Sequence, residues 1–458
     1  MTIRLLCAHD IYPANAVVTL NAGTEAGLIA SKQASATLTG GVPYIAPQPL
    51  SKGGKMVLAG DSISNQNNQV SATFNATLAK GYFTQAAAML GQRFEAVRNA
   101  GVSGNTTADL LARLQTDVLA QQPEWCFMHI GTNDVGGDVP SSVTTANIEE
   151  LCRRMTGAGI KLILSTIMPR GFAGMTQARL ATMMANNAFI QAYAVRNSIP
   201  LVDLYRYMLD YSDITTTSQG EPVATWFDGA KLHPLAAGAV QMGYAIARQL
   251  DAIIPKLPRR LQLNYNGVNG DAANLIRNGM FAPGAAGTLG LNASGTVAQN
   301  WTAAAAGGAI SGACSIVPRS ASFNDNTPGN VQRVALTGAG ASTEIFRLTP
   351  TIATPTVGDL VYLEVEILAT ASVGTIAEIS LSWGTVGGTV ISCAANYMAS
   401  AAETLAIGTV PYLVVLKTEA MVIPVGTLGV YGSINIRTST GAVAQVDAAT
   451  ARLSRVTQ

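Results

Sequence analysis

Short apolar segments alternate with amphipathic, helix-like segments from Lys55 to about residue 250, and this alternation constrains the fold more than any other feature of the chain. The strand-like runs include KMVLAG, EWCFMHIG, IKLILSTI and IPLVDL, and helix-like runs such as TADLLARLQTDVLAQ and NIEELCRRMTGAG lie between them. Strands that alternate with helices predict a mainly parallel sheet covered by helices on both faces. We expect the last helix to begin at Pro234, because proline suits a first helical position. In such a fold, ligands bind beyond the carboxyl ends of the strands.

The helical periodicity ends at about residue 272. The runs DLVYLEVEIL, AEISLSWG and PYLVVLKTEAMVI, separated by Gly, Pro and Thr, predict an antiparallel β sandwich instead. A chain of 458 residues also exceeds what one hydrophobic core usually supports. We therefore expect an N-terminal segment and linker at 1–52, an α/β domain at 53–256, a linker at 257–272 and a β sandwich at 273–458.

Composition argues against several kinds of partner. Charged residues make up 12% of the chain and the formal net charge is +1, so no basic surface for nucleic acid is expected. The N-terminal sequence lacks the apolar core of a signal peptide, and no apolar run reaches the roughly eighteen residues of a membrane helix. The five cysteines are widely spaced and form no CxxC pair. We therefore expect no membrane span, disulfide framework, metal or cofactor.

Four short motifs carry the residues most suited to chemistry. Gly60-Asp61-Ser62-Ile63 follows the first strand, where a serine can project its hydroxyl over the sheet edge, but this motif alone is a weak signal. It is joined by NAGVSGNTT around Gly104, HIGTNDV around Asn133, and DGAKLHP ending in His233. The joint occurrence, in this order, is far more specific than any one motif.

Histidine usage points to the same region. The chain has only three histidines, and His9 lies in the N-terminal segment, outside the α/β unit. His129 lies within an apolar strand, where a hydrogen-bonded core histidine is the expectation. Only His233 belongs to a motif, which makes it the candidate base.

The four motifs, spread across residues 55 to 250, resemble those of the SGNH (GDSL-like) hydrolases. The resemblance implies a three-layer α/β/α, flavodoxin-like fold and serine esterase activity. It also implies Ser62 as nucleophile, His233 as general base, and an oxyanion hole made by the Ser62 N–H, the Gly104 N–H and the Asn133 side-chain amide. A hydroxyl needs an adjacent imidazole to act as a nucleophile, and each preorganised oxyanion donor is worth about 3 kcal/mol.

The acid of the triad departs from the family pattern. Family members usually have an aspartate three residues before the histidine, but Ala230 occupies that position and the nearest acid is Asp228, five residues before His233. If the two extra residues bulge outward, Asp228 still reaches the ring and fixes its tautomer. Otherwise a backbone carbonyl orients His233 and the enzyme works as a dyad. Asp203 and Asp213 are weaker alternatives.

Candidate substrate-binding residues lie on either side of these motifs. Asn65 begins the amide-rich run NQNNQ, which either hydrogen-bonds sugar hydroxyls or is simply a solvated loop. Trp226 and Phe227 precede the histidine motif and would form an aromatic platform for a sugar, unless they belong to the core. Neither region has the long apolar stretch expected of a lipase lid.

The segment NLIRNGMFAPG, followed by Trp301, resembles the opening of jelly-roll carbohydrate-binding modules. We therefore expect a jelly-roll sandwich in which Trp301 and Trp383 either stack on sugar rings or are buried. A structural or trimer-forming role is the alternative for this domain.

The leading hypothesis is an esterase that removes O-acetyl groups from a carbohydrate such as a bacterial surface polysaccharide. The alternatives are a lipid or thioester esterase, and a non-catalytic glycan-binding or structural virion protein. The small-residue composition and the N-terminal segment resemble bacteriophage tail-spike proteins. They favour a virion-associated or extracellular location and a homo-oligomer, a trimer if the tail-spike likeness holds.

Overall fold

The computed structural model describes residues 54–67, 75–171, 175–212, 221–254, 274–323, 325, 327, 329–338, 344–398 and 403–456, and three short strands before them. The chain divides into two compact units, Met1–Ser51 and Lys52–Gln458. The first unit contains a small antiparallel sheet in the order β2-β1-β3, formed by Val17–Thr19, Thr2–Leu5 and Ala34–Ser35. The second unit carries every motif singled out above.

A five-stranded parallel sheet forms the centre of the α/β part, as predicted. Its strand order is β6-β4-β7-β8-β9, which is the 2-1-3-4-5 order of flavodoxin-like folds. The strands are β4 (Lys55–Gly60), β6 (Glu95–Gly101), β7 (Trp125–His129), β8 (Lys161–Ser165) and β9 (Leu201–Val202). The expected fold class is thereby confirmed.

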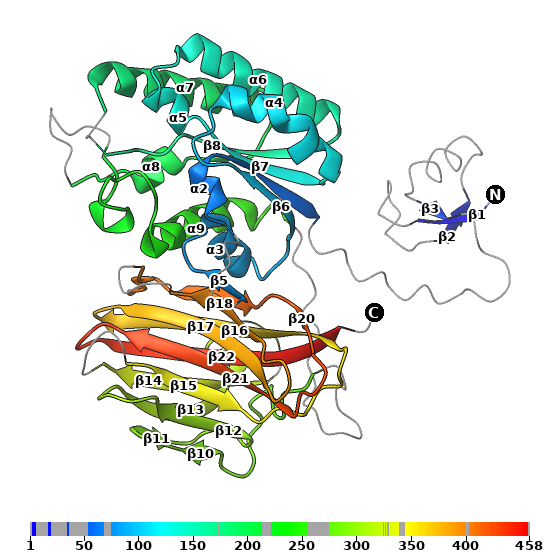
Figure 1. The fold of residues 1–458 in the computed structure, drawn as a ribbon, viewed down its shortest axis with the longest axis vertical. Coiled ribbons are helices and arrows are strands. Elements are labelled where there is room, and N and C mark those ends of the chain that lie inside the picture. Colours follow the sequence, from blue (N-terminus) through cyan, green and yellow to red (C-terminus); the bar gives the residue numbers. More distant parts are fainter. Residues whose placement is uncertain are drawn as a thin grey trace. The chain divides into compact units, whose positions relative to one another are not determined.

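Helices cover both faces of this sheet, because its central strands are apolar on both sides (Figure 1). On β4, Val57 and Ala59 pack in one core with helices α4, α6 and α7, while Met56 and Leu58 pack in a second core with α3 and α9. The helices are α2 (Ser62–Asn65), α3 (Tyr82–Met89), α4 (Thr107–Asp117), α5 (Thr132–Gly136), α6 (Ser141–Gly157), α7 (Gln177–Arg196), α8 (Leu204–Met208) and α9 (Ala236–Leu250).

The last helix begins slightly later than predicted. Pro234 forms an isolated antiparallel bridge with Phe227, so its backbone belongs to an extended segment and Leu235 is the N-cap. No helix among the described residues is long and apolar enough to cross a membrane. Four of the five cysteines are free and buried, and Cys7 lies outside the described residues.

The C-terminal part is a β sandwich, as expected. One sheet has the order β10-β12-β15-β21-β17-β18-β5 and the other β11-β13-β14-β22-β16-β19, and most pairs are antiparallel. The strands of the first sheet are β5 (Asn75–Leu78), β10 (Thr288–Leu289), β12 (Trp301–Ala305), β15 (Phe346–Pro350), β17 (Ile376–Val386), β18 (Ser392–Tyr397) and β21 (Gly429–Thr438). Those of the second are β11 (Ala293–Gly295), β13 (Ser311–Pro318), β14 (Asn330–Thr337), β16 (Leu360–Val373), β19 (Tyr412–Lys417) and β22 (Val443–Val456), and β20 (Met421–Val422) pairs with β16. The jelly-roll likeness stays a prediction.

Both candidate sugar-stacking tryptophans of the sandwich are buried. Trp301 is 2% exposed, stacks on Phe281 with ring centroids 4.7 Å apart, and donates its indole N–H to the Asn278 carbonyl. Trp383 is fully buried and donates to the Thr418 hydroxyl. Of the two alternatives, the buried one holds for both residues.

One strand of the sandwich comes from the α/β part of the sequence. Strand β5 (Asn75–Leu78) lies between Ser62 and α3 in the chain, yet it pairs in parallel with β18 at the edge of the first sheet (Figure 1). The sequence analysis did not predict this strand.

Candidate active site

Ser62, His233 and Asp228 form one chain of hydrogen bonds. His233 Nε2 lies 2.9 Å from Ser62 Oγ, and His233 Nδ1 lies 3.2 Å from Asp228 Oδ2. Ser62 is the first residue of α2, directly after the carboxyl end of β4, and all three side chains are half-buried. Solvent therefore reaches Ser62, and the hydrogen bonds to Ser62 and Asp228 hold the imidazole of His233 in place.

The unusual spacing of the aspartate is absorbed by a tight turn. Asp228 Oδ1 accepts hydrogen bonds from the backbone N–H groups of Leu232 and His233, at 2.9 and 3.3 Å, while Oδ2 faces the imidazole. The Lys231 N–H donates to the Asp228 carbonyl, and Lys231 adopts a φ of 49° to close the turn. Burial raises the pKa of the Asp228 carboxyl, but these hydrogen bonds outweigh it and hold the pKa below its ordinary value.

Of the other candidate acids, Asp203 is engaged away from His233. Asp203 accepts from the Thr166 hydroxyl and from Gln191 and caps α8. Asp213 lies outside the described residues. The geometry therefore offers Asp228 as the third member.

The three predicted oxyanion donors follow three adjacent strands, β4, β6 and β7. Gly104 has a φ of 80°, which favours glycine, and a Cβ at this position would meet no atom within 4 Å. Asn133 donates from Nδ2 to the Asn105 carbonyl at 2.9 Å, and this ties its side chain to the loop after Gly104. The second N–H of that amide is the one that could serve an oxyanion.

Arg113, on α4, was not singled out from the sequence. Its guanidinium donates to the carbonyls of Gly60 and Ala100, at 2.9 and 2.7 Å, and to the Asn105 side chain at 2.6 Å. It thereby joins the ends of β4 and β6 to the Gly104 loop. Its spacing of four residues from Asp117, with which it also pairs, resembles an ordinary surface ion pair, so the sequence carried no signal for the inward contacts.

A buried polar layer supports the turn that carries Ser62. Asp61 caps α2 by accepting from the Ile63 N–H at 2.9 Å, and burial, with a smaller contribution from Asp134, raises the pKa of its carboxyl to about 7. The Tyr82 hydroxyl lies 2.8 Å from Ser64 Oγ. Beside this layer, burial lowers the pKa of His129 to about 4, and its Nδ1 lies 2.7 Å from Ser165 Oγ.

The predicted substrate-binding residues differ in their positions. Phe227 is 3% exposed and packs in the core with α9, so of its two alternatives the core position holds and it forms no platform for a sugar. Trp226 packs against the same core but is half-buried, and Asn65 is half-buried on α2. Their roles in substrate binding stay predictions.

Among the described residues, no group of three or more His, Cys, Asp or Glu side chains is placed to hold a metal ion. The site contains a hydroxyl, an imidazole and a carboxylate joined by hydrogen bonds in that order, at the carboxyl edge of a parallel sheet. This arrangement is that of a serine hydrolase.

Comparison with known proteins gives the family. Residues 58–240 match the model of the GDSL-like Lipase/Acylhydrolase family, and this part of the chain belongs to that family. An acetylxylan esterase of Geobacillus stearothermophilus is 37% identical over 93 residues, which is 19% of this chain and 42% of that protein. An uncharacterized lipoprotein of Bacillus subtilis, YqeF, is 37% identical over 79 residues, 16% of this chain and 32% of that protein. The chain thus spans less than half the length of these curated relatives.

Solved structures are also similar to the α/β part. A GDSL-like lipase from Bacteroides thetaiotaomicron is 22% identical, with 45% of this chain and 92% of that chain covered and a TM-score of 0.36. The acetylxylan esterase of Geobacillus stearothermophilus is 22% identical, with 44% and 96% covered and a TM-score of 0.36.

Proposed function

We propose that this protein is a serine esterase that removes O-acetyl groups from a carbohydrate. The observation that carries the proposal is the hydrogen-bonded series from Ser62 Oγ through His233 to Asp228, at 2.9 and 3.2 Å. Membership of residues 58–240 in an acylhydrolase family supports the ester chemistry. The acetylxylan esterase relative supports an acetylated sugar as substrate.

The proposed reaction has two steps. As Ser62 Oγ bonds to the ester carbonyl carbon, its proton passes to His233 Nε2, and the Asp228 carboxylate stabilises the imidazolium. The carbonyl oxygen, now negative, accepts hydrogen bonds from the Ser62 and Gly104 N–H groups and from the Asn133 amide. The tetrahedral intermediate collapses, and the sugar oxygen leaves with the proton from His233.

Deacylation repeats this chemistry with water. The oxygen of a water molecule bonds to the acetyl carbon while His233 takes one of the water protons. His233 then returns this proton to Ser62 Oγ as acetate leaves. Extracellular location, virion association and oligomeric state stay predictions.

Acetate release from O-acetylated polysaccharide tests the proposal, with p-nitrophenyl acetate and octanoate as small esters. We expect release by the wild type, and a loss of about 10⁶-fold in kcat with Ser62→Ala, as in serine hydrolases that lose the nucleophile. Ser103→Ala, in the neighbouring loop, is the matched control and should keep full activity. Preference for octanoate would shift the proposal to lipid esters, and inactivity on every ester would contradict it.

A further inference from the structure

Helix α3 stands between the turn that carries Ser62 and the β sandwich. On the nucleophile side, Asn67 Oδ1 accepts from the Phe83 N–H at 2.6 Å, and Asn67 Nδ2 donates to the Ser64 carbonyl at 2.8 Å. The hydroxyl of Tyr82, the first residue of α3, lies 2.8 Å from Ser64 Oγ. All of these residues are buried. The first turn of α3 therefore holds the residues two and five positions after the nucleophile.

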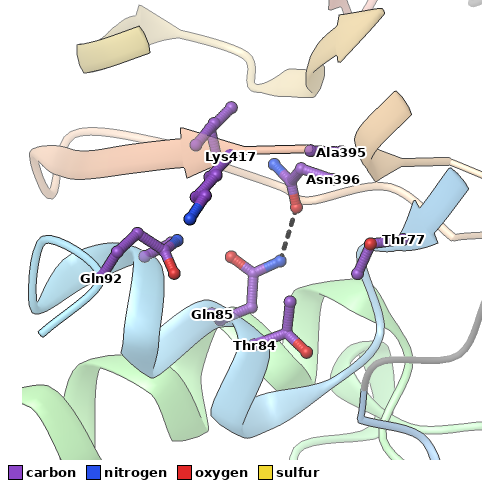
Figure 2. A pocket seen from close by; sticks show the side chains of 9 residues that line it. Thr77, Thr84, Gln85, Gln92, Ala395, Asn396 and Lys417 are labelled. Carbon is purple, nitrogen blue, oxygen red and sulfur yellow. Dashed lines mark hydrogen bonds between the residues drawn. The ribbon is translucent and has the colours of Figure 1, made fainter. Parts of the chain in front are cut away.

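The same helix is anchored in the sandwich by Gln85. Its Nε2 donates to Asn396 Oδ1 at 2.7 Å (Figure 2). The same Nε2 donates to the Ala79 carbonyl, and the Gln85 Oε1 accepts from the Tyr412 hydroxyl, both at 2.7 Å. Asn396 Nδ2 donates in turn to the Ile379 carbonyl and to the Tyr412 hydroxyl. Both hydrogens and the oxygen of the Gln85 amide are thus used, and Gln85 is 1% exposed. A buried network with every group paired fixes one relative placement of the elements that share it.

Helix α9, which follows His233, packs on the same surfaces. Ala236 and Val240 belong to the sandwich's own hydrophobic core, together with Ala79 and Ala88 from the α3 region. A Cβ on Gly243 would lie 2.8 Å from Gln85 Cβ, so the two helices touch closely at this point. The helix beside the nucleophile and the helix after the base therefore both rest on the sandwich.

One small cavity lies where α3 meets the sandwich. The cavity shown in Figure 2 has a volume of about 20 Å³, which is enough for one water molecule. It is lined chiefly by polar side chains, Thr77, Thr84, Gln85, Gln92, Asn396 and Lys417. Gln92 closes one side by donating to the Val415 carbonyl at 2.8 Å. Such a space suits a bridging water rather than a sugar.

We propose that the β sandwich is part of the catalytic scaffold: it holds α3 and α9 so that Ser62 and His233 stay within hydrogen-bonding distance. Gln85, Asn396 and Tyr412 are then positioning residues that act through α3. The inference rests on the proposed esterase function. It gives the sandwich a role that does not depend on sugar binding.

The test is Tyr412→Phe, which removes one hydroxyl and leaves the buried Gln85 oxygen without a donor. We expect kcat on p-nitrophenyl acetate to fall about 2- to 30-fold, the range for coupling through a packed network. KM should stay within about twofold, because no group that meets the ester changes. Gln85→Ala should lower kcat further.

Tyr431→Phe is the matched control, since it makes the same chemical change on a half-exposed tyrosine of the sandwich. It should leave kcat unchanged. A Tyr412→Phe variant that melts at a lower temperature yet keeps the wild-type kcat would overturn the inference, because the sandwich would then contribute stability alone.

Amide hydrogen exchange supplies a readout that does not need activity. Tyr412→Phe should speed exchange in residues 62–67 and in the first turn of α3 relative to Tyr431→Phe, whereas faster exchange confined to the sandwich would contradict the inference. If the wild type hydrolyses no ester, the proposed function fails, and the exchange pattern still decides whether the sandwich supports this turn.

Discussion

Two aspartates close to Ser62 meet opposite environments. The carboxyl of Asp228 is half-exposed and surrounded by N–H donors, which hold its pKa below the ordinary value. The carboxyl of Asp61 is fully buried, and burial raises its pKa to about 7. Asp228 is thus favoured as the charged carboxylate beside His233. Asp61 is instead the N-cap of α2, and burial disfavours its charged form.

Replacement of Asp228 by asparagine should separate triad from dyad. Asp228→Asn keeps an oxygen for the Leu232 N–H but removes the charge beside His233 Nδ1. We expect kcat to fall about 10⁴-fold, as for an aspartate-to-asparagine change in a serine protease triad, with little change in KM. Asp203→Asn is the control. A fall of less than about tenfold would indicate that Asp228 only shapes the turn and that the enzyme works as a dyad.

Asp61→Asn should alter the pH dependence of stability. Since folding raises the pKa of this carboxyl from 3.8 to about 7, the folded state keeps a proton that the unfolded chain releases between these values. The stability contributed is present below pH 3.8 and is lost as the pH rises through about 7. A shift of about three pKa units corresponds to up to ~4 kcal/mol.

We therefore expect Asp61→Asn, which retains an acceptor for the Ile63 N–H, to gain stability relative to the wild type at pH 8 but not at pH 4. Urea unfolding at the two pH values measures this difference. An equal difference at both values would contradict the raised pKa.

At the scale of single residues, motifs in the sequence predicted the residues that meet in the site but not their surroundings. The position of Asp228 was left open, because spacing alone does not show that residues 229–231 form a turn that returns the carboxylate to His233. The choice between core and platform for Phe227 was also left open, because two adjacent aromatic residues give no periodicity that shows which one is buried. Such distinctions depend on tertiary packing.

At the scale of secondary structure, α4 is the element whose role the sequence concealed. Its Arg113 binds the carbonyls at the ends of β4 and β6 and the side chain of Asn105. The Asn105 carbonyl in turn holds the Asn133 amide. One helix thereby supports two of the three candidate oxyanion donors.

Arg113→Lys should weaken this support while retaining the charge near Asp117. Lysine is a point charge and cannot serve three separated acceptors as a guanidinium does. We expect kcat on p-nitrophenyl acetate to fall roughly 10- to 100-fold with KM nearly unchanged, by analogy with the loss of part of an oxyanion hole. Arg98→Lys, which alters another arginine paired with Asp117, should have little effect. If Arg113→Lys and Arg98→Lys were equally active, the prediction that Arg113 supports the oxyanion donors would be contradicted.

Alternating patterns predicted the parallel strands and the sandwich strands well, because each is buried by its immediate neighbours. Strand β5 was missed for the opposite reason: NATL is a four-residue run whose partner β18 lies in the last quarter of the sequence. No local pattern records such a pairing.

At the scale of the whole molecule, the sandwich and the α/β part share a core, with Ala236 and Val240 of α9 inside it. A chain ending at residue 256 would expose these side chains and leave Gln85 without its sandwich partners. We expect such a fragment to be insoluble or to lack most of the esterase activity of the full chain. Soluble yield and p-nitrophenyl acetate hydrolysis measure this, and a soluble fragment with wild-type kcat would contradict it.

The contact between α3 and the sandwich also sets the order in which a newly made chain can fold. Gln85 and its partner Asn396 are 311 residues apart. At roughly 5–20 residues per second, a ribosome needs on the order of 15–60 seconds to synthesise that interval. During this time α3 has left the ribosome while the surface that receives it does not yet exist. The nucleophile turn therefore gains its final support only after Asn396 and Tyr412 have been translated.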